Sequence, residues 1–186
     1  MQPTLSKAIG DLRALLPVVE QLGPELARLA EAMLRSWNAG GKVLIAGNGG
    51  SAADAMHFAE ELVVRYGKNR RALAAMALCD PTVLTCAAND YGYEAVFSRQ
   101  VEAFGNRGDV LIVLTTSGRS PNLGRAVTSA KSRGMLTASF LGKDGGPLKG
   151  ACDIELLVPS EQTGRIQECH KLLYHALCEW VDEQVE

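Results

Sequence analysis

The sequence lacks the features that mark membrane proteins, secreted proteins and nucleic-acid-binding proteins. Its longest apolar runs, such as Val110–Leu114, are far shorter than the roughly 20 residues of a membrane-spanning helix. The N-terminal segment carries Lys7, Asp11 and Arg13 and has no apolar core, unlike a signal peptide. The formal net charge is −2, from 19 basic and 21 acidic residues, and there is no long basic cluster. We therefore expect a cytoplasmic protein that binds neither membranes nor nucleic acid.

Paired cysteines are absent too. The five cysteines are an odd number and form no C-x-x-C motif, which argues against a disulfide framework and against a thiolate zinc site. They are expected to be reduced and mostly packed in the interior. The length of 186 residues suffices for one well-buried domain. We predict a single domain over residues 1–186, in which residues 1–40 form an N-terminal helical element for assembly.

Residues 43–61 are the stretch around which the chain is organised. An apolar run at Val43–Ala46 fits a buried strand, and a glycine-rich turn at residues 47–50 leads into an Ala-rich helix that opens at Ser51. This layout binds phosphate well, because free backbone N–H groups converge at a helix N-terminus and the helix dipole favours an anion. Ser51 either caps the helix or donates its hydroxyl to the same anion. The competing interpretation is a tight connection, since GNGGS matches neither the dinucleotide fingerprint nor the P-loop.

His57 and Glu61 follow on the same predicted helix. Their i,i+4 spacing places them on one face of it. Such a pair is often a surface ion pair, but here it lies among closely packing alanines, which favours a functional role. An anion site beside a His/Glu pair indicates chemistry on a phosphorylated small molecule.

The rest of the chain alternates apolar strands with helices. Two helices come first, at residues 4–22 (interrupted by Pro17) and 25–39; they have no strand to follow, and we favour packing against another subunit over packing across the domain. Strands are predicted at 42–47, 72–78, 109–114, 135–141 and 153–158, and helices at 51–66, 81–88, 93–104, 121–133 and 165–186. This pattern predicts an α/β fold: a three-layer sandwich around a five-stranded parallel sheet in the flavodoxin-like order 2-1-3-4-5, with an N-terminal helical hairpin.

In this strand order, the loops after the first and third strands meet at the switch point, where ligands bind. The second of these loops, residues 115–121, holds four hydroxyls between a buried strand and Pro121. Hydroxyls and helix N-terminal amides bind a phosphate without a charged partner. We favour that interpretation over an ordinary Ser120 N-cap with polar filler.

The C-terminal helix carries His175 among leucines, with Gln167 two turns earlier. Taken alone, the histidine fits a hydrogen-bonded core residue, and the glutamine fits a solvated or capping residue. The pattern by itself assigns a function to neither.

Five motifs occur in order along the chain: GNGGSAADAMHFAEEL, AANDYGYE, TTSGRSPN, GKDGG and RIQECHKLLYH. Together they resemble the bacterial phosphoheptose isomerases, single-domain members of the sugar-isomerase (SIS) fold, over almost the whole chain. The resemblance implies conversion of sedoheptulose 7-phosphate to D-glycero-D-manno-heptose 7-phosphate, the entry to lipopolysaccharide core and other heptose pathways. It also implies a cytoplasmic homotetramer with zinc at the active site.

The resemblance further implies roles for individual residues. The family's metal positions fall on His57, Glu61, Gln167 and His175. Its sugar- and phosphate-binding positions fall on Asn48, Gly49, Gly50, Ser51, Glu61, Asn89, Asp90, Thr115, Thr116, Ser117, Ser120 and Gln167. Two imidazoles, a carboxylate and an amide oxygen suit zinc better than calcium. Thr115 and Arg119 depart mildly from the family pattern, and Arg119 either touches the phosphate or points outward.

Aldose–ketose isomerisation moves one proton between C1 and C2 and another between their oxygens. We assign Glu61 as the base for the carbon-bound proton and His175 as the acid/base partner at the oxygens, with Asp90 orienting the hydroxyls. On a continuous helix Gln167 and His175 stand about 12 Å apart along the axis. Both therefore reach one ion only if Gln167 lies at a distorted helix start or comes from another subunit.

Two alternatives from other functional classes remain. One is a non-catalytic SIS protein that binds a partner such as the replication initiator DnaA, and the other is a sensor that binds a sugar phosphate without converting it. The presence of both Glu61 and His175 favours the enzyme.

Overall fold

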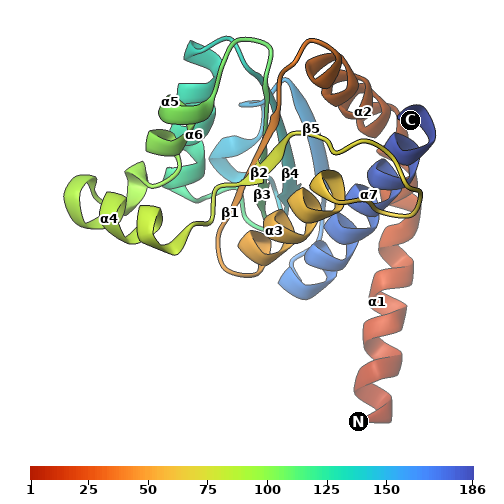
Figure 1. Ribbon diagram of the computed structural model, residues 1–186. Helices are drawn as coiled ribbons and strands as arrows, with labels where there is room; N and C mark the ends of the chain where they lie inside the picture. The colour runs from red at the N-terminus through yellow and green to blue at the C-terminus, as the bar shows by residue number, and fades with distance from the viewer.

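Five short apolar segments form a parallel sheet in the computed structural model, which describes all 186 residues (Figure 1). They are β1 (Val43–Gly47), β2 (Ala75–Ala77), β3 (Val110–Thr115), β4 (Leu136–Gly142) and β5 (Ile154–Val158). Their order is β2-β1-β3-β4-β5, and every pair is parallel, as predicted. Strand β2 covers only three residues of the predicted 72–78, in line with the low strand propensity of alanine.

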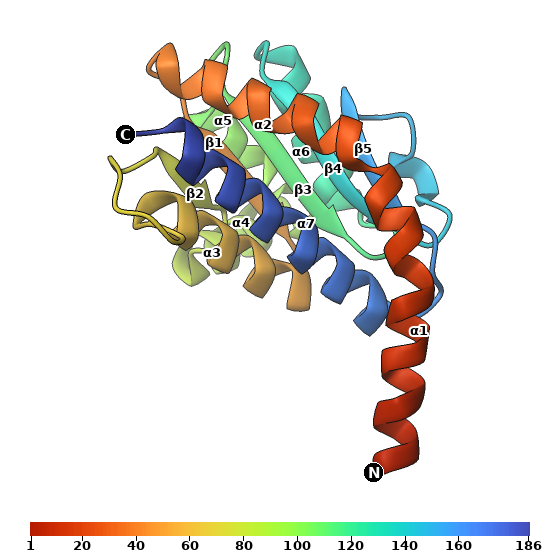
Figure 2. The same ribbon diagram turned by 90° about the vertical axis from the view of Figure 1, so that its right-hand side faces the viewer.

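Helices cover both faces of the sheet, which gives the predicted three layers. On one face lie α2 (Gly23–Asn38), α3 (Gly50–Val63) and α7 (Thr163–Gln184), whose apolar side chains pack with those of the strands. Figure 2 shows these three helices side by side across the sheet. On the other face lie α4 (Pro81–Tyr91), α5 (Ser98–Phe104) and α6 (Pro121–Ser132). No helix combines the length and the apolar character that crossing a membrane requires.

The N-terminal helical pair differs from the prediction. Helix α2 covers the sheet: Leu29 and Met33 are wholly buried in the same apolar cluster as β1, β3 and β5. This helix therefore packs across its own domain, which was the less favoured of the two alternatives, and its role in assembly stays a prediction. Helix α1 (Gln2–Gln21) runs through Pro17 without a break and packs on the body through its second half, where Val19 is buried. Its first half projects beyond the body in both views (Figures 1 and 2).

Helix α4 is longer than predicted. The segment Asn89-Asp90-Tyr91-Gly92 was expected to separate two helices, but its first three residues form the last turn of α4. Only Gly92, whose φ is +83°, breaks the helix. The helix begins as a proline-started helix should: the Asp80 carboxylate accepts hydrogen bonds from the amides of Thr82 and Val83. A 3-10 turn at Tyr93–Ala95 then leads into α5.

Candidate functional site

The loops that follow β1 and β3 enclose a small polar cavity. The two strands are neighbours in register, Gly47 opposite Leu114, so their carboxyl ends lie at the same edge of the sheet. The cavity has a volume of about 90 Å³. Its lining residues are Asn48, Ser51, Leu114, Thr115, Thr116, Ser117 and Ser120. The two loops predicted to meet at the switch point therefore do so, and the cavity between them is lined mainly by hydroxyl and amide groups.

Two helices begin beside this cavity without a side-chain cap. Helix α3 has Gly49 as its N-cap, with φ +56°, and α6 has Ser120, whose hydroxyl does not cap the helix. Ser51 lies inside the first turn of α3, so of its two alternative roles the structure excludes capping of the helix. Uncapped helix N-termini present free N–H groups and the positive end of the helix dipole. An anion bound in the cavity would accept hydrogen bonds from these N–H groups and would be stabilised by the dipoles of both helices.

Asn48 is held in place by two residues that the sequence did not single out. Its side-chain amide exchanges two hydrogen bonds with the amide of buried Asn122, at 3.1 and 2.9 Å. The Tyr93 hydroxyl donates a third, at 3.0 Å, to Asn48 Oδ1. The sequence did contain a hint of the role of Asn122. An amide side chain follows Pro121 directly, and the strand order places this position opposite the first loop at the switch point.

The GKDGG motif packs tightly against the loop after β3. Gly118 has φ +63°, and a Cβ added to it would lie 1.8 Å from the carbonyl oxygen of Gly145. Arg119 forms an exposed ion pair with Asp144 of the same motif, at 2.5 Å. Of the two alternatives for Arg119, the structure shows the outward-pointing one.

We expect Gly118→Ala to destabilise the protein by at least about 2 kcal/mol, because it combines a left-handed backbone conformation with a backbone clash. Gly124→Ala in α6 is the matched control, since open space surrounds Gly124 and alanine favours a helix. Chemical denaturation measures both. Equal stability of the two variants would show that the tight contact with Gly145 does not constrain this loop.

His57, Glu61 and His175 form a compact group on α3 and α7. His57 Nε2 lies 2.9 Å from Glu61 Oε1, and one potential ligand atom from each of the three residues lies within 4.8 Å of the others. The Glu61 side chain is 15% exposed and that of His57 37%. Burial, followed by electrostatic repulsion from His57 and Lys171, lowers the pKa of His175, which favours a neutral imidazole that is able to bind a metal.

A buried ion pair fixes the position of α7 relative to the C-terminal end of α3. Arg70 Nε lies 2.7 Å from Asp182 Oδ1, and the guanidinium also donates to the carbonyls of Glu61 and Leu62 at the end of α3. Arg70 therefore contributes to the packing of these two helices. Because Arg70 joins the backbone of Glu61 to α7, it keeps that residue beside His175.

The other predicted site residues lie apart from this group. Gln167 is on a regular part of α7, well past its start at Thr163, which excludes the distorted helix start. Its amide nitrogen lies against Gly50, at the beginning of α3 and two helical turns before His57. Asn89 and Asp90 are exposed on the last turn of α4, where the Asn89 amide donates to Asp90 Oδ1 at 2.8 Å.

The three grouped side chains fit a zinc ion. Two imidazoles and a carboxylate are a common zinc donor set with a position left open. Nε2 of His175 is buried and has no hydrogen-bond partner. Buried polar atoms normally have a partner, so this nitrogen is a ready-made ligand atom.

Comparisons with known proteins converge on one family. The family model of the SIS domain matches residues 9–142. The phosphoheptose isomerase of Fusobacterium nucleatum is 48% identical over 163 residues, which cover 88% of this chain and 84% of the relative. That of Paramagnetospirillum magneticum is 55% identical over 83% of this chain and 81% of the relative. The solved structure of phosphoheptose isomerase GmhA from Neisseria gonorrhoeae superposes with a TM-score of 0.91 at 40% identity, covering 98% of both chains.

Proposed function

Because the chain belongs to the phosphoheptose isomerase family of SIS-domain proteins and is thus a sugar-phosphate isomerase, we propose that it converts sedoheptulose 7-phosphate to D-glycero-D-manno-heptose 7-phosphate. The observation that carries this proposal is that α3 joins two different sites. Its N-terminus borders the polar cavity, and the His57–Glu61–His175 group lies about 10 Å further along the axis. A seven-carbon sugar that bears its phosphate on C7 and reacts at C1 and C2 needs such a separation.

The phosphate is bound by hydroxyls and backbone amides. The hydroxyl ligands are Ser51, Thr115, Thr116, Ser117 and Ser120, all of which line the cavity. Two uncapped helix N-termini supply N–H groups and favourable dipoles, so a dianion is bound without a cationic side chain. Asn48, Gly49 and Gly50 continue from this site towards the sugar hydroxyls, and Gln167 packs against Gly50 on the same side.

Glu61 abstracts the proton from the substrate carbon, and His175 transfers the proton between the C1 and C2 oxygens. The geometry supports these roles, since both groups lie in one partly buried cluster, and the lowered pKa of His175 favours its neutral imidazole. Zinc held by His57, Glu61 and His175 would supply Lewis-acid polarisation of the substrate oxygens. A metal-bound carboxylate is a weaker base, so Glu61 would accept the proton less readily if it also held the ion.

Gln167 as a fourth metal ligand requires a second subunit, because within one chain its amide lies at the other end of the site. Asn89 and Asp90 are exposed on α4 and would likewise complete the sugar site between subunits. The proposed enzyme is a cytoplasmic homotetramer, with a single SIS domain over residues 1–186, that feeds lipopolysaccharide or another heptose pathway.

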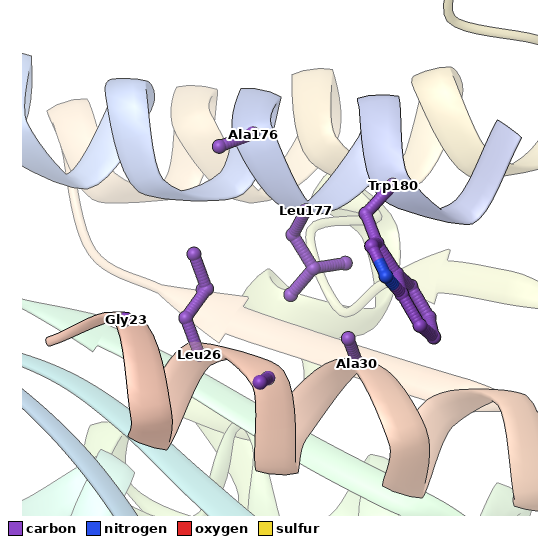
Figure 3. Close-up of a pocket in the computed structure, with 7 residues that line it drawn as sticks. Gly23, Leu26, Ala30, Ala176, Leu177 and Trp180 are labelled. Atoms are coloured by element: carbon purple, nitrogen blue, oxygen red, sulfur yellow. The ribbon is translucent and has the colours of Figure 1, made fainter. Parts of the chain in front are cut away.

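Two apolar surfaces support assembly. The projecting half of α1 exposes Leu5 and Ile9, one turn apart. The second apolar surface lines a cavity of about 210 Å³ between α2 and α7. Figure 3 shows Leu26 and Leu177 directed into this cavity and Trp180 at one side of it. Burying both against other copies would remove apolar area from water.

Light scattering is expected to give the mass of a tetramer. Leu5→Glu with Ile9→Glu should lower that mass while the circular dichroism spectrum stays that of a folded protein, because these side chains touch little of their own chain. A wild-type monomer at working concentration would refute the assembly proposal.

The decisive test of function is the consumption of sedoheptulose 7-phosphate and the appearance of the heptose 7-phosphate, followed by NMR. Turnover is expected. Binding of the sugar phosphate without turnover would favour a sensor, and neither binding nor turnover would favour a partner-binding SIS protein.

A further inference from the structure

The side of the His57 ring that faces away from Glu61 has its own polar environment. The Tyr174 hydroxyl lies 3.3 Å from His57 Nδ1, and Lys171 Nζ lies 3.4 Å from the same nitrogen. Nε2, on the opposite side, is 2.9 Å from Glu61. Both ring nitrogens of His57 therefore have polar neighbours.

Tyr174 is rigidly placed. It is fully buried, and its ring stacks on Phe58 with centroids 5.0 Å apart and meets the His175 ring edge-on at 4.8 Å. The phenol consequently has little freedom to move away from His57. Lys171, by contrast, has a 44% exposed side chain.

Asp54 completes the environment. It is buried on α3, one turn before His57, and Oδ1 lies 3.5 Å from Lys171 Nζ. A buried carboxylate normally requires a partner, and Lys171 supplies one here.

We infer that Tyr174 is a positioning residue for His57, which it holds through Nδ1 so that Nε2 faces Glu61 and the metal position. A hydroxyl both donates and accepts, so it serves either tautomer of the imidazole. Without metal, Nε2–H donates to Glu61, and Nδ1 accepts from the tyrosine. If Nε2 held a metal, Nδ1–H would donate to the tyrosine oxygen instead.

Lys171 cannot take over this role. Its ammonium group only donates, so it suits an accepting Nδ1 and opposes a protonated one. Metal-bound histidines usually donate their second N–H to such an acceptor, and loss of the acceptor lowers metal affinity about 10- to 100-fold. This inference rests on the zinc site of the proposed function.

The test compares Tyr174→Phe with Tyr66→Phe. The second variant also removes a phenol hydroxyl near the group, since the Tyr66 ring lies 5.4 Å from that of His175, but Tyr66 has no contact with His57 Nδ1. Zinc affinity is measured by competition with a chromophoric chelator. We expect a decrease of at least about 10-fold for Tyr174→Phe and less than 2-fold for Tyr66→Phe. Equal affinities of Tyr174→Phe and the wild type overturn the inference.

A second measurement does not depend on metal. In zinc-free protein, the ¹⁵N resonance of His57 Nδ1 should shift in Tyr174→Phe, because a hydrogen-bond donor is lost, and should stay in place in Tyr66→Phe. An unchanged resonance in Tyr174→Phe also overturns the inference. If the wild type binds no zinc, the zinc site of the proposed function fails, while this spectrum still decides whether Tyr174 holds His57.

Discussion

Glu61→Gln is expected to lower kcat by about 10³-fold, which corresponds to about 4 kcal/mol in the activation free energy. The amide has nearly the same shape as the carboxylate but cannot accept the proton from the substrate carbon. The phosphate cavity lies about three helical turns away and is unchanged, so binding of the sugar phosphate should persist. Turnover is measured with sedoheptulose 7-phosphate, and binding is measured by calorimetry.

Glu60→Gln is the matched control for this variant. Glu60 is the adjacent residue of α3 but is exposed and lies outside the group of potential metal ligands. It should retain wild-type turnover. If Glu61→Gln also turned over at a near wild-type rate, Glu61 would not be the base, and the proton would have to go to another group.

The sheet could be predicted because its strands are continuous apolar runs. Such runs, alternating with helices, are compatible with few arrangements other than a parallel sheet covered on both faces. The switch point followed from the strand order, and it brought together Asn48, Ser51 and the hydroxyls of residues 115–120. The strand order was therefore sufficient to predict this part of the site.

The errors have local causes. Periodicity shows that α2 has an apolar face but not which partner covers it, and here the partner is the sheet of the same chain. The Asn89-Asp90-Tyr91 segment has the composition of a turn, yet it continues α4. The helix ends at the next residue, Gly92, which provides the positive φ. Capping of α3 by Ser51 was plausible from residue type, but the helix begins at Gly50.

The side-chain partners were beyond the reach of sequence reasoning. Asn122 and Tyr93 reach Asn48 from positions 74 and 45 residues away, and Tyr174 meets His57 across 117 residues. The contact between Tyr174 and His57 depends on the parallel packing of α3 against α7, which the position of His175 among leucines does not reveal. The resemblance to a family supplied His175, and the structure supplied the neighbours that surround it.

Protein purified without chelator is expected to contain about one zinc ion per chain, and His175→Ala is expected to lose it. The variant removes a buried nitrogen that has no other partner, along with one of three grouped ligands. Its loss of affinity should exceed the 10- to 100-fold that removal of an outer-shell partner costs. Elemental analysis measures the zinc content.

Leu172→Ala, an exposed substitution on the same helix, should keep the zinc and serves as the control. Zinc affinity of the wild type should fall as the pH drops through about 6.5, because imidazoles must be neutral to bind. The lowered pKa of His175 delays its own protonation to more acidic pH. Zinc that remains undiminished in His175→Ala would remove that residue from the ligand set. A wild type that contains no metal and is fully active in chelator would leave His57, Glu61 and His175 as a metal-free acid/base site, in which His57 and Glu61 form an ion pair.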